Sequence, residues 1–260
     1  AVVLRKLRHF QEQGHKAVLI VGDFTAQVGD PSGKSETRKR LSEAEVRGYA
    51  ENVLDGFKKV LIWDDDLLEV RYNSEWLSKL DMADVLELTS KMTLAQMLER
   101  DDFSKRFAAN QPISMMEFMY PLLQGMDSVA IDADIELGGS DQLWNNLVGR
   151  ELMGRYGKRP QMVMTVPLLV GTDGALKMSQ SLGNYIGVDD EPADMFGKVM
   201  SIPDEAMEQY FRLATELPEA EVDTIVAGLA DGSAHPGETK RRLGREIVAQ
   251  FYDGGAATDA

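Results

Sequence analysis

The chain has 260 residues, 43% of them hydrophobic and 27% charged, which is typical of a globular protein with one large domain or a core domain plus a smaller one. Its net charge of -15 argues against a general nucleic-acid coat or an anionic membrane surface, although a local basic patch can still bind a phosphate backbone. With no cysteine, disulfides, thiol nucleophiles and zinc–cysteine sites are excluded. The 3 histidines lack metal-ligand spacing, so no protein metal site is expected. No apolar run is long enough to span a membrane, so we expect no membrane association and a cytoplasmic location.

The first third of the chain alternates between helix and strand patterns. An amphipathic helix is expected over residues 2–10 and another over 42–59. Apolar runs predict strands over 17–23, 59–63 and 67–72, and the first has the continuous apolar character of a buried parallel strand. Such alternation predicts an α/β domain with a mostly parallel sheet.

A basic, glycine-rich loop follows the first predicted strand, whose end at Gly22 and Asp23 is where ligands of parallel sheets gather. The loop VGDPSGKSETRKR carries Lys34 and Arg38, and a flexible basic loop at a strand end can fold over phosphates. It is one residue short of a P-loop, because GxxxxGK requires glycine at position 28, which is valine. A P-loop phosphotransferase is therefore a distant alternative, and a solvated basic loop is another.

A methionine-rich helical segment is predicted over residues 82–118. Methionine fills irregular packing, so these side chains indicate core or subunit contacts in preference to a cofactor site. We expect part of this insertion to form a dimer surface.

Polar side chains gather where a plain core segment would carry leucines. Tyr120, Gln124 and Asp127 have the spacing that places them on one face of a helix, where they can line a pocket with a phenol, an amide and a carboxylate. Such groups suit a small zwitterionic ligand. Protein carboxylates bind the ammonium of the ligand, and a buried acid or amide of the protein discriminates a ligand that carries a phenol or amide. The alternative is an ordinary capped helix with polar surface residues.

The residues that follow predict a second half to this site. A short buried strand is expected over 128–131, and GGSDQ is expected to form a glycine turn before a helix over 141–156, which Ser140 or Asp141 can cap.

A second flexible loop, GTDGALKMSQSLGN, follows an apolar strand predicted over 162–170. Its single cation, Lys177, and its hydroxyls give it the composition of a phosphate-binding loop, although a lysine in such a loop commonly has no special role. Beyond residue 187 the pattern predicts four or five helices with prolines near their starts. A basic run in the last of them, from Lys240 to Arg245, fits either a nucleic-acid contact or a solvated helix face.

Four segments, GDPSGKSETR, YPLLQGMD, GGSDQLWNN and ALKMSQSLGNYIGV, together closely resemble the bacterial tyrosyl-tRNA synthetases, which are class I enzymes. The resemblance covers essentially the whole chain in the right order, and GGSDQ followed by WNN resembles the tyrosyl enzymes more than the related tryptophanyl ones. It implies a Rossmann-like catalytic domain over 1–187, with a helical dimer-interface insertion at about 82–118. A small all-α, anticodon-side domain and linker would occupy 188–260.

The resemblance also implies roles for particular residues. Asp127 would read the phenolic hydroxyl of tyrosine, and Tyr120 and Gln124 would help hold its ammonium. The implied tyrosine-binding residues are Asp30, Tyr120, Gln124, Asp127 and Gln142. The implied catalytic cations are Lys34, Arg38 and Lys177. The implied ATP-binding residues are Asp141, which lies where the family contacts the ribose, and Lys177, Met178 and Ser179 of the KMSKS-type loop.

The activity implied is that of a tyrosine–tRNA ligase, acting on tyrosine, ATP with Mg²⁺, and tRNA(Tyr) as a homodimer without a tightly bound cofactor. Two departures qualify it. The HIGH motif of the family would lie before Ala1, and the second lysine of KMSKS is Gln180. The C-terminal RNA-binding module of the family is also expected beyond this chain. A truncated synthetase with weak or no activity is therefore expected, and the alternative is a non-catalytic tyrosine-binding or regulatory paralogue.

Overall fold

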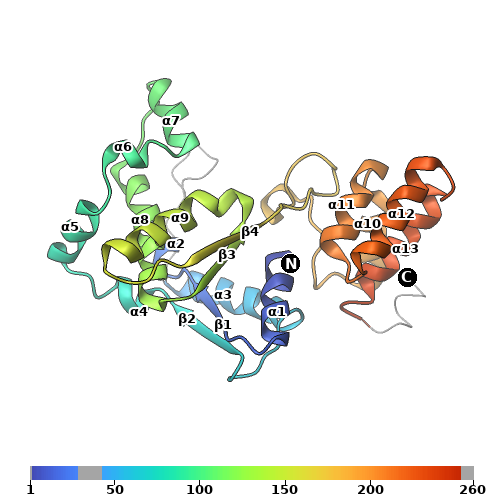
Figure 1. The fold of residues 1–260 in the computed structure, drawn as a ribbon, viewed down its shortest axis with the longest axis horizontal. Helices are drawn as coiled ribbons and strands as arrows, with labels where there is room; N and C mark the ends of the chain where they lie inside the picture. Colours follow the sequence, from blue (N-terminus) through green and yellow to red (C-terminus); the bar gives the residue numbers. More distant parts are fainter. Residues whose placement is uncertain (1, 29–42, 253–260) are drawn as a thin grey trace. The chain divides into compact units, whose positions relative to one another are not determined.

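The structure, a computed structural model, describes residues 2–28 and 43–252 (Figure 1). It divides into two compact units, one of Leu7–Val166 and one of Ala1–Lys6 with Pro167–Ala260. The domain boundary that we predict between residues 187 and 188 stays a prediction. Among the described residues, no helix is both long and apolar enough to cross a membrane.

Parallel strand pairs form the framework of the unit at 7–166. Strand β1 (Ala17–Val21) pairs with β2 (Leu68–Tyr72), and β3 (Ile135–Gly139) pairs with β4 (Met162–Val166). Both pairs are parallel, and each forms a two-stranded sheet (Figure 1). Parallel strands need crossover connections, which the intervening helices supply. The α/β prediction is confirmed.

Helices account for most of the rest of this part of the chain. They are α1 (Val2–Glu12), α2 (Thr25–Val28), α3 (Glu43–Lys58), α4 (Ser74–Leu77), α5 (Met82–Ser90), α6 (Leu94–Met97), α7 (Asp101–Ala108), α8 (Met115–Ile131) and α9 (Leu143–Arg155). Three of them begin at capping boxes, whose N-cap residues are Asp81, Thr93 and Ser114. These caps mark where three helices begin within the helical insertion that we predict over 82–118.

Helices α8 and α9 pack closely against each other. The approach depends on small residues, since a Cβ on Gly125 would lie 2.6 Å from Leu152 Cδ1 and 3.4 Å from the Cα of Gly149. The same two helices contribute to a core that includes the fully buried Phe103 and Met153. Side chains on α8 are thereby fixed against α9, which positions the site described below.

Two predicted strands are wrong. Residues 128–131 form the last turns of α8, which ends at Asp132 in the left-handed conformation (φ 57°), because the apolar pattern of this stretch continues the helical face. Residues 59–63 form turns after α3. There Gln11 donates to the carbonyl of Ile62 at 2.9 Å and accepts from its N–H at 3.0 Å, so a side chain satisfies the backbone that a sheet partner would otherwise bind.

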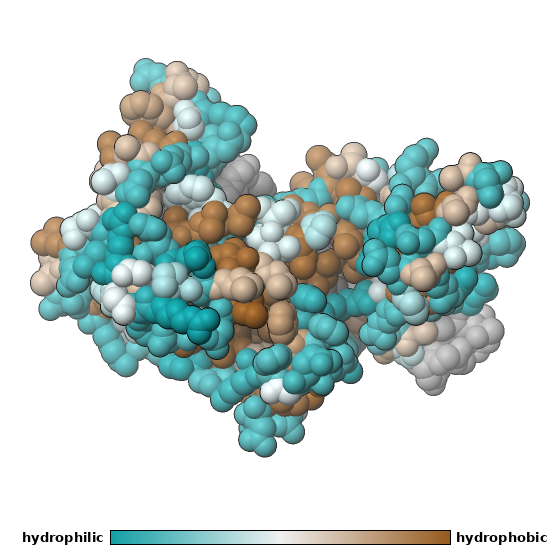
Figure 2. Space-filling model, in the orientation of Figure 1, coloured by the Kyte–Doolittle hydropathy of each residue, from teal (hydrophilic) through white to brown (hydrophobic). Residues whose placement is uncertain are grey.

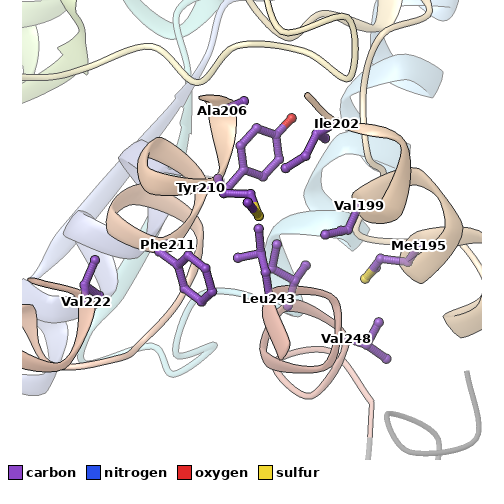
Figure 3. Packing of buried hydrophobic residues seen from close by; sticks show 11 residues of the cluster. Met195, Val199, Ile202, Ala206, Tyr210, Phe211, Val222, Leu243 and Val248 are labelled. Atoms are coloured by element: carbon purple, nitrogen blue, oxygen red, sulfur yellow. The ribbon is translucent and has the colours of Figure 1, made fainter. Parts of the chain in front are cut away.

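The other unit is built around four α-helices of the described chain after residue 187. They are α10 (Pro192–Ser201), α11 (Met207–Ala214), α12 (Glu219–Asp231) and α13 (Pro236–Val248). Prolines stand in the first turn of α10 and α13 and at the N-cap of α12, as predicted. Their buried faces form one apolar cluster that includes Met195, Phe211 and Leu243 (Figure 3).

Three cations of the basic run on α13, Lys240, Arg241 and Arg242, form contacts within the chain. Lys240 is buried and donates to the carbonyl of Ile202 at 2.6 Å, and it pairs with Asp204 at 2.5 Å. The neighbouring arginines pair with acids of the same unit, Arg241 with Glu238 and Arg242 with Glu221. A solvated face therefore describes the two arginines but not Lys240, whose role is to hold α13 against the 202–204 turn.

Candidate functional site

The polar residues of the predicted pocket lie on α8, where we expected them. Tyr120 and Gln124 are half-buried, and Asp127 is buried with an exposed fraction of 8%. The helix begins after the capping box of Ser114 and runs unbroken through all three residues. Their spacing of four and three residues therefore places the three side chains on one face of the helix. The predicted shared helical face is confirmed.

Both oxygens of Asp127 accept hydrogen bonds from the β2–α4 junction. Trp76 Nε1 donates to Oδ1 at 2.9 Å and Asn73 Nδ2 donates to Oδ2 at 3.3 Å. Burial raises the pKa of Asp127 to about 7, and the Trp76 and Asn73 hydrogen bonds oppose this rise, whereas the carboxylates of Glu136 and Asp23 add to it. A carboxylate has about four lone-pair sites, so this group can still accept a hydrogen bond from a ligand hydroxyl.

Asn73 links this carboxylate to the carboxyl end of β1. It accepts a hydrogen bond from the N–H of Phe24 at 2.9 Å and donates to Thr25 Oγ1 at 3.0 Å. Beside it, Asp23 accepts from the N–H of Phe24 and from the N–H of Ser74, each at 2.9 Å. The site thus lies where two neighbouring parallel strands end, the usual place for ligands in such sheets.

Asn73 and Trp76 are functional candidates that the sequence analysis missed. Asn73 is the N-cap residue of α4 but makes no side-chain cap hydrogen bond. Its amide is fully buried and bonds across the site. The position of Asn73 in the sequence could have identified it, since an asparagine directly after a buried parallel strand lies at the edge of the sheet where ligands bind.

A buried asparagine joins two further predicted residues. Asn145 Nδ2 donates to Gln124 Oε1 at 3.1 Å and to Gln142 Oε1 at 3.2 Å. Gln142 reaches this position because β3 ends at Gly139 and a 3-10 turn, Ser140–Gln142, leads into α9. The predicted amides of α8 and of the GGSDQ segment therefore meet in one hydrogen-bond chain.

The expected cap on this segment is wrong. The two glycines of GGSDQ end strand β3, and neither the 3-10 turn nor α9 has a side-chain cap hydrogen bond from Ser140 or Asp141. Asp141 is exposed on the turn.

A second polar cluster stands behind the turn. Glu136, on β3, accepts from Ser128 Oγ at 2.9 Å and from Gln161 Nε2. In the amide orientation that satisfies its neighbours, Asn146 donates to Glu136 Oε1 at 3.2 Å and to the carbonyl of Gln142 at 3.1 Å. Burial raises the pKa of Glu136, while the hydrogen bonds from Ser128 and Gln161 oppose the rise. This cluster holds the backbone of Gln142 in place.

The loop with Lys177 belongs to the other unit. Lys177 is exposed and its backbone forms an antiparallel bridge with Val170, while Met178 donates its N–H to the carbonyl of Leu169 at 2.8 Å. The Met178 side chain packs against the apolar cluster of the helical unit. Ser179 Oγ lies 2.9 Å from Ser181 Oγ. The loop thus presents a cation and two hydroxyls from a short hairpin.

Three predicted site residues, Asp30, Lys34 and Arg38, lie outside the described residues. Within the parts of the chain that the structure describes, no group of three or more His, Cys, Asp or Glu side chains is placed to hold a metal ion.

Comparisons with known proteins show the family of this chain. A family model described as class I tRNA synthetases (W and Y) matches residues 1–260. A curated tyrosine–tRNA ligase of Moorella thermoacetica is 54% identical over 259 residues, covering 100% of this chain and 62% of that protein. One of Geobacter sulfurreducens is 53% identical over 259 residues, covering 100% of this chain and 64% of that protein. The chain thus spans less than two thirds of the length of these relatives.

Solved structures share the fold. A tyrosyl-tRNA synthetase from Archaeoglobus fulgidus, complexed with L-tyrosine, matches with a TM-score of 0.76 and 21% identity over 99% of this chain and 84% of that one. A tryptophanyl-tRNA synthetase from Campylobacter jejuni matches with a TM-score of 0.64 and 17% identity over 98% of this chain and 82% of that one. At these identities the likeness concerns the fold alone.

Proposed function

Because this chain belongs to the class I tRNA synthetases of the W and Y family, we propose that it activates tyrosine with ATP and transfers it to tRNA(Tyr), as a tyrosine–tRNA ligase. The observation that carries the proposal is the buried carboxylate of Asp127, which Trp76 and Asn73 hold. The same helix carries Gln124, which Asn145 joins to Gln142. The names of the relatives that are more than half identical to this chain support tyrosine over tryptophan.

Asp127 would select the substrate through its phenolic hydroxyl. A buried carboxylate that accepts from this hydroxyl is left with an unmet hydrogen bond when phenylalanine binds. A site of this kind discriminates by about 10⁴- to 10⁵-fold. In this proposal Asp30, Gln142, Tyr120 and Gln124 complete the tyrosine site, the last two holding the ammonium.

The reaction needs no protein nucleophile. The tyrosine carboxylate attacks the α-phosphorus of ATP, so that an acyl phosphate bond forms while the bond to pyrophosphate breaks. A ribose hydroxyl at the 3' end of tRNA then attacks the carbonyl carbon and releases AMP. Catalysis rests on holding the reactants in line and on placing positive charge where phosphate charge develops.

The proposed ATP groups serve those two needs. Lys34, Arg38 and Lys177 would neutralise the leaving pyrophosphate. Asp141, exposed on its turn, would contact the ribose, and Met178 and Ser179 would contribute from the loop. Mg²⁺ would arrive with ATP as part of the substrate and neutralise phosphate charge.

The proposal includes a homodimer formed through the insertion at 82–118. Large apolar side chains are exposed there, and Met82, Leu86, Phe107 and Met115 have exposed fractions of 73%, 63%, 65% and 79%. Figure 2 shows hydrophobic surface next to hydrophilic surface on the part formed by α5 to α7. Clusters of exposed apolar side chains mark interaction surfaces. A cytoplasmic location stays a prediction.

Tyrosine-dependent exchange of pyrophosphate into ATP tests the proposal. It is measured on this chain and on the natural full-length protein, with phenylalanine and tryptophan as controls. Exchange that requires tyrosine supports the ligase. Tyrosine binding without exchange in either form contradicts it and supports a non-catalytic tyrosine-binding paralogue, which the glutamine at position 180 favours because it removes one charge from the phosphate loop.

A further inference from the structure

A buried asparagine organises the loop that carries Lys177. Asn184 has an exposed fraction of 6%. Its Nδ2 donates to Asp173 Oδ2 at 2.6 Å and to the carbonyl of Lys177 at 3.2 Å, and its Oδ1 accepts from the N–H of Ser179 at 2.9 Å. One side chain thus bonds to the two residues that flank Met178 and to the acid at the start of the loop.

The acid is itself committed to the loop backbone. Asp173 Oδ1 accepts from the N–H groups of Ala175 and Leu176, each at 2.8 Å. These bonds, together with the one from Asn184, lower the pKa of Asp173. The carboxylate therefore stays ionised at neutral pH and accepts from three donors at once.

The surrounding backbone is shaped to admit this contact. A Cβ on Gly171 would lie 2.2 Å from Asn184 Nδ2, so only glycine fits there. The Asn184 carbonyl also accepts from the N–H of Thr172 at 2.9 Å. The loop is thus closed on itself from residue 171 to residue 184 around a single amide.

The base of the loop is anchored separately. Tyr210 donates its hydroxyl to the carbonyl of Val170 at 2.8 Å, and this hydroxyl lies at the edge of the apolar cluster (Figure 3). Gln209 donates to the carbonyl of Leu168 at 3.0 Å and accepts from the N–H of Val170. Because these bonds come from α11 and not from the loop, loss of the Asn184 contacts is expected to loosen the loop without unfolding the unit.

We infer that Asp173 and Asn184 form a clasp that positions Lys177 and Ser179 for phosphate contact. This inference rests on the proposed function, which assigns those two residues to ATP. Neither clasp residue needs to touch the substrate, so both are positioning residues. The loop has glutamine at position 180 in place of a second lysine, so Lys177 is the single cation of residues 171–184. Holding Lys177 in position before ATP binds therefore matters more for stabilising the phosphate charge.

The test compares four variants of the natural full-length protein. Asn184→Ala removes the side chain, and Asn184→Asp places two carboxylates face to face. Asp173→Asn combined with Asn184→Asp restores an amide-to-carboxylate bond with donor and acceptor exchanged. Asp231→Asn is the matched control, because Asp231 is an exposed acid that likewise accepts from a backbone N–H two residues ahead, Ser233, at 2.8 Å, but outside the loop.

The kinetic readout separates positioning from general damage. For Asn184→Ala we expect kcat/KM for ATP in the exchange reaction to fall about tenfold or more, the effect of losing a hydrogen bond to a charged group. The KM for tyrosine is expected to stay at the wild-type value. Asn184→Asp is expected to be worse, the double swap better than Asn184→Asp, and the control unchanged. An Asn184→Ala enzyme with wild-type kcat/KM for ATP, or a swap no better than Asn184→Asp, overturns the inference.

A second readout does not depend on activity. Trypsin cleaves after lysine, and Lys177 is exposed. Cleavage at this bond is expected to be faster in Asn184→Ala and Asn184→Asp than in wild type, and slower in the swap than in Asn184→Asp. If the wild-type protein shows no exchange, the ligase proposal fails while the cleavage rates still decide the clasp. Equal cleavage in all four variants contradicts it.

Discussion

The indole nitrogen of Trp76 lies 2.9 Å from Asp127 Oδ1, and it donates a hydrogen bond to that buried carboxylate across 51 residues of sequence. Asn73, three residues before Trp76, holds the other oxygen. The carboxylate is therefore fixed in orientation before any ligand arrives, which lowers the ordering cost of binding.

Trp76→Phe is expected to weaken tyrosine binding with little change in fold. The ring volume is largely kept, but one donor to the Asp127 carboxylate is lost, and a hydrogen bond to a charged group contributes about 1.5–3 kcal/mol. We expect the Kd for tyrosine, measured by calorimetry, to rise about tenfold or more. Trp63→Phe is the control, because that side chain is 43% exposed. Equal Kd values for tyrosine in the two variants would contradict a role of Trp76 in tyrosine binding.

Tyrosine affinity is expected to rise with pH across neutrality. The pKa of Asp127 is raised to about 7, so the carboxyl is protonated below that pH and ionised above it. In the ionised form both oxygens are acceptors, whereas in the protonated form one of them carries a hydrogen and becomes a donor. The Kd for tyrosine should therefore fall between pH 6 and pH 8, whereas in Asp127→Asn it should be weak and independent of pH over this range. A flat wild-type profile would contradict the role given to Asp127.

Gly149→Ala is expected to destabilise the unit at 7–166. The added Cβ would lie 2.2 Å from Ser128 Oγ, which bonds to Glu136, so α8 and α9 would have to separate. Overpacking of this kind costs about 1–3 kcal/mol in the free energy of unfolding. Gly197→Ala is the control, since beyond the neighbouring backbone of α10 no atom lies within 4 Å of its added Cβ. That change should stabilise by up to about 1 kcal/mol. Urea unfolding of both variants measures the difference.

Lys240→Met is expected to destabilise the helical unit. The substitution keeps most of the apolar stem but leaves the carbonyl of Ile202 without the ammonium that bonds it at 2.6 Å. An unsatisfied buried acceptor costs about 1–3 kcal/mol. Arg241→Met, which breaks an exposed pair with Glu238, should change the free energy of unfolding by less than about 0.5 kcal/mol. Thermal unfolding measures both variants. Equal losses of stability in Lys240→Met and Arg241→Met would contradict the buried role of Lys240.

Much of the local structure could be predicted because it depends on neighbours in sequence. The apolar run at 17–23 predicts a parallel strand, and the prolines near 192, 218 and 236 mark helix starts. The spacing of Tyr120, Gln124 and Asp127 places them on one helical strip because 3.6 residues make a turn. The predicted strands at 128–131 and 59–63 failed where a short apolar run fits either a helix or a strand, or where a distant side chain satisfies the backbone.

The sequence by itself determined the family, the alternation of strands and helices, and the residue types suited to tyrosine and phosphate. The tertiary structure decided which of those residues meet. Asn145 joins Gln124 to Gln142, and Trp76 and Asn73 hold Asp127, through hydrogen bonds between segments far apart in the chain. Hydrogen bonds act over about 3 Å, so their partners are set by how the strands pair and how α8 packs on α9, and not by spacing along the chain.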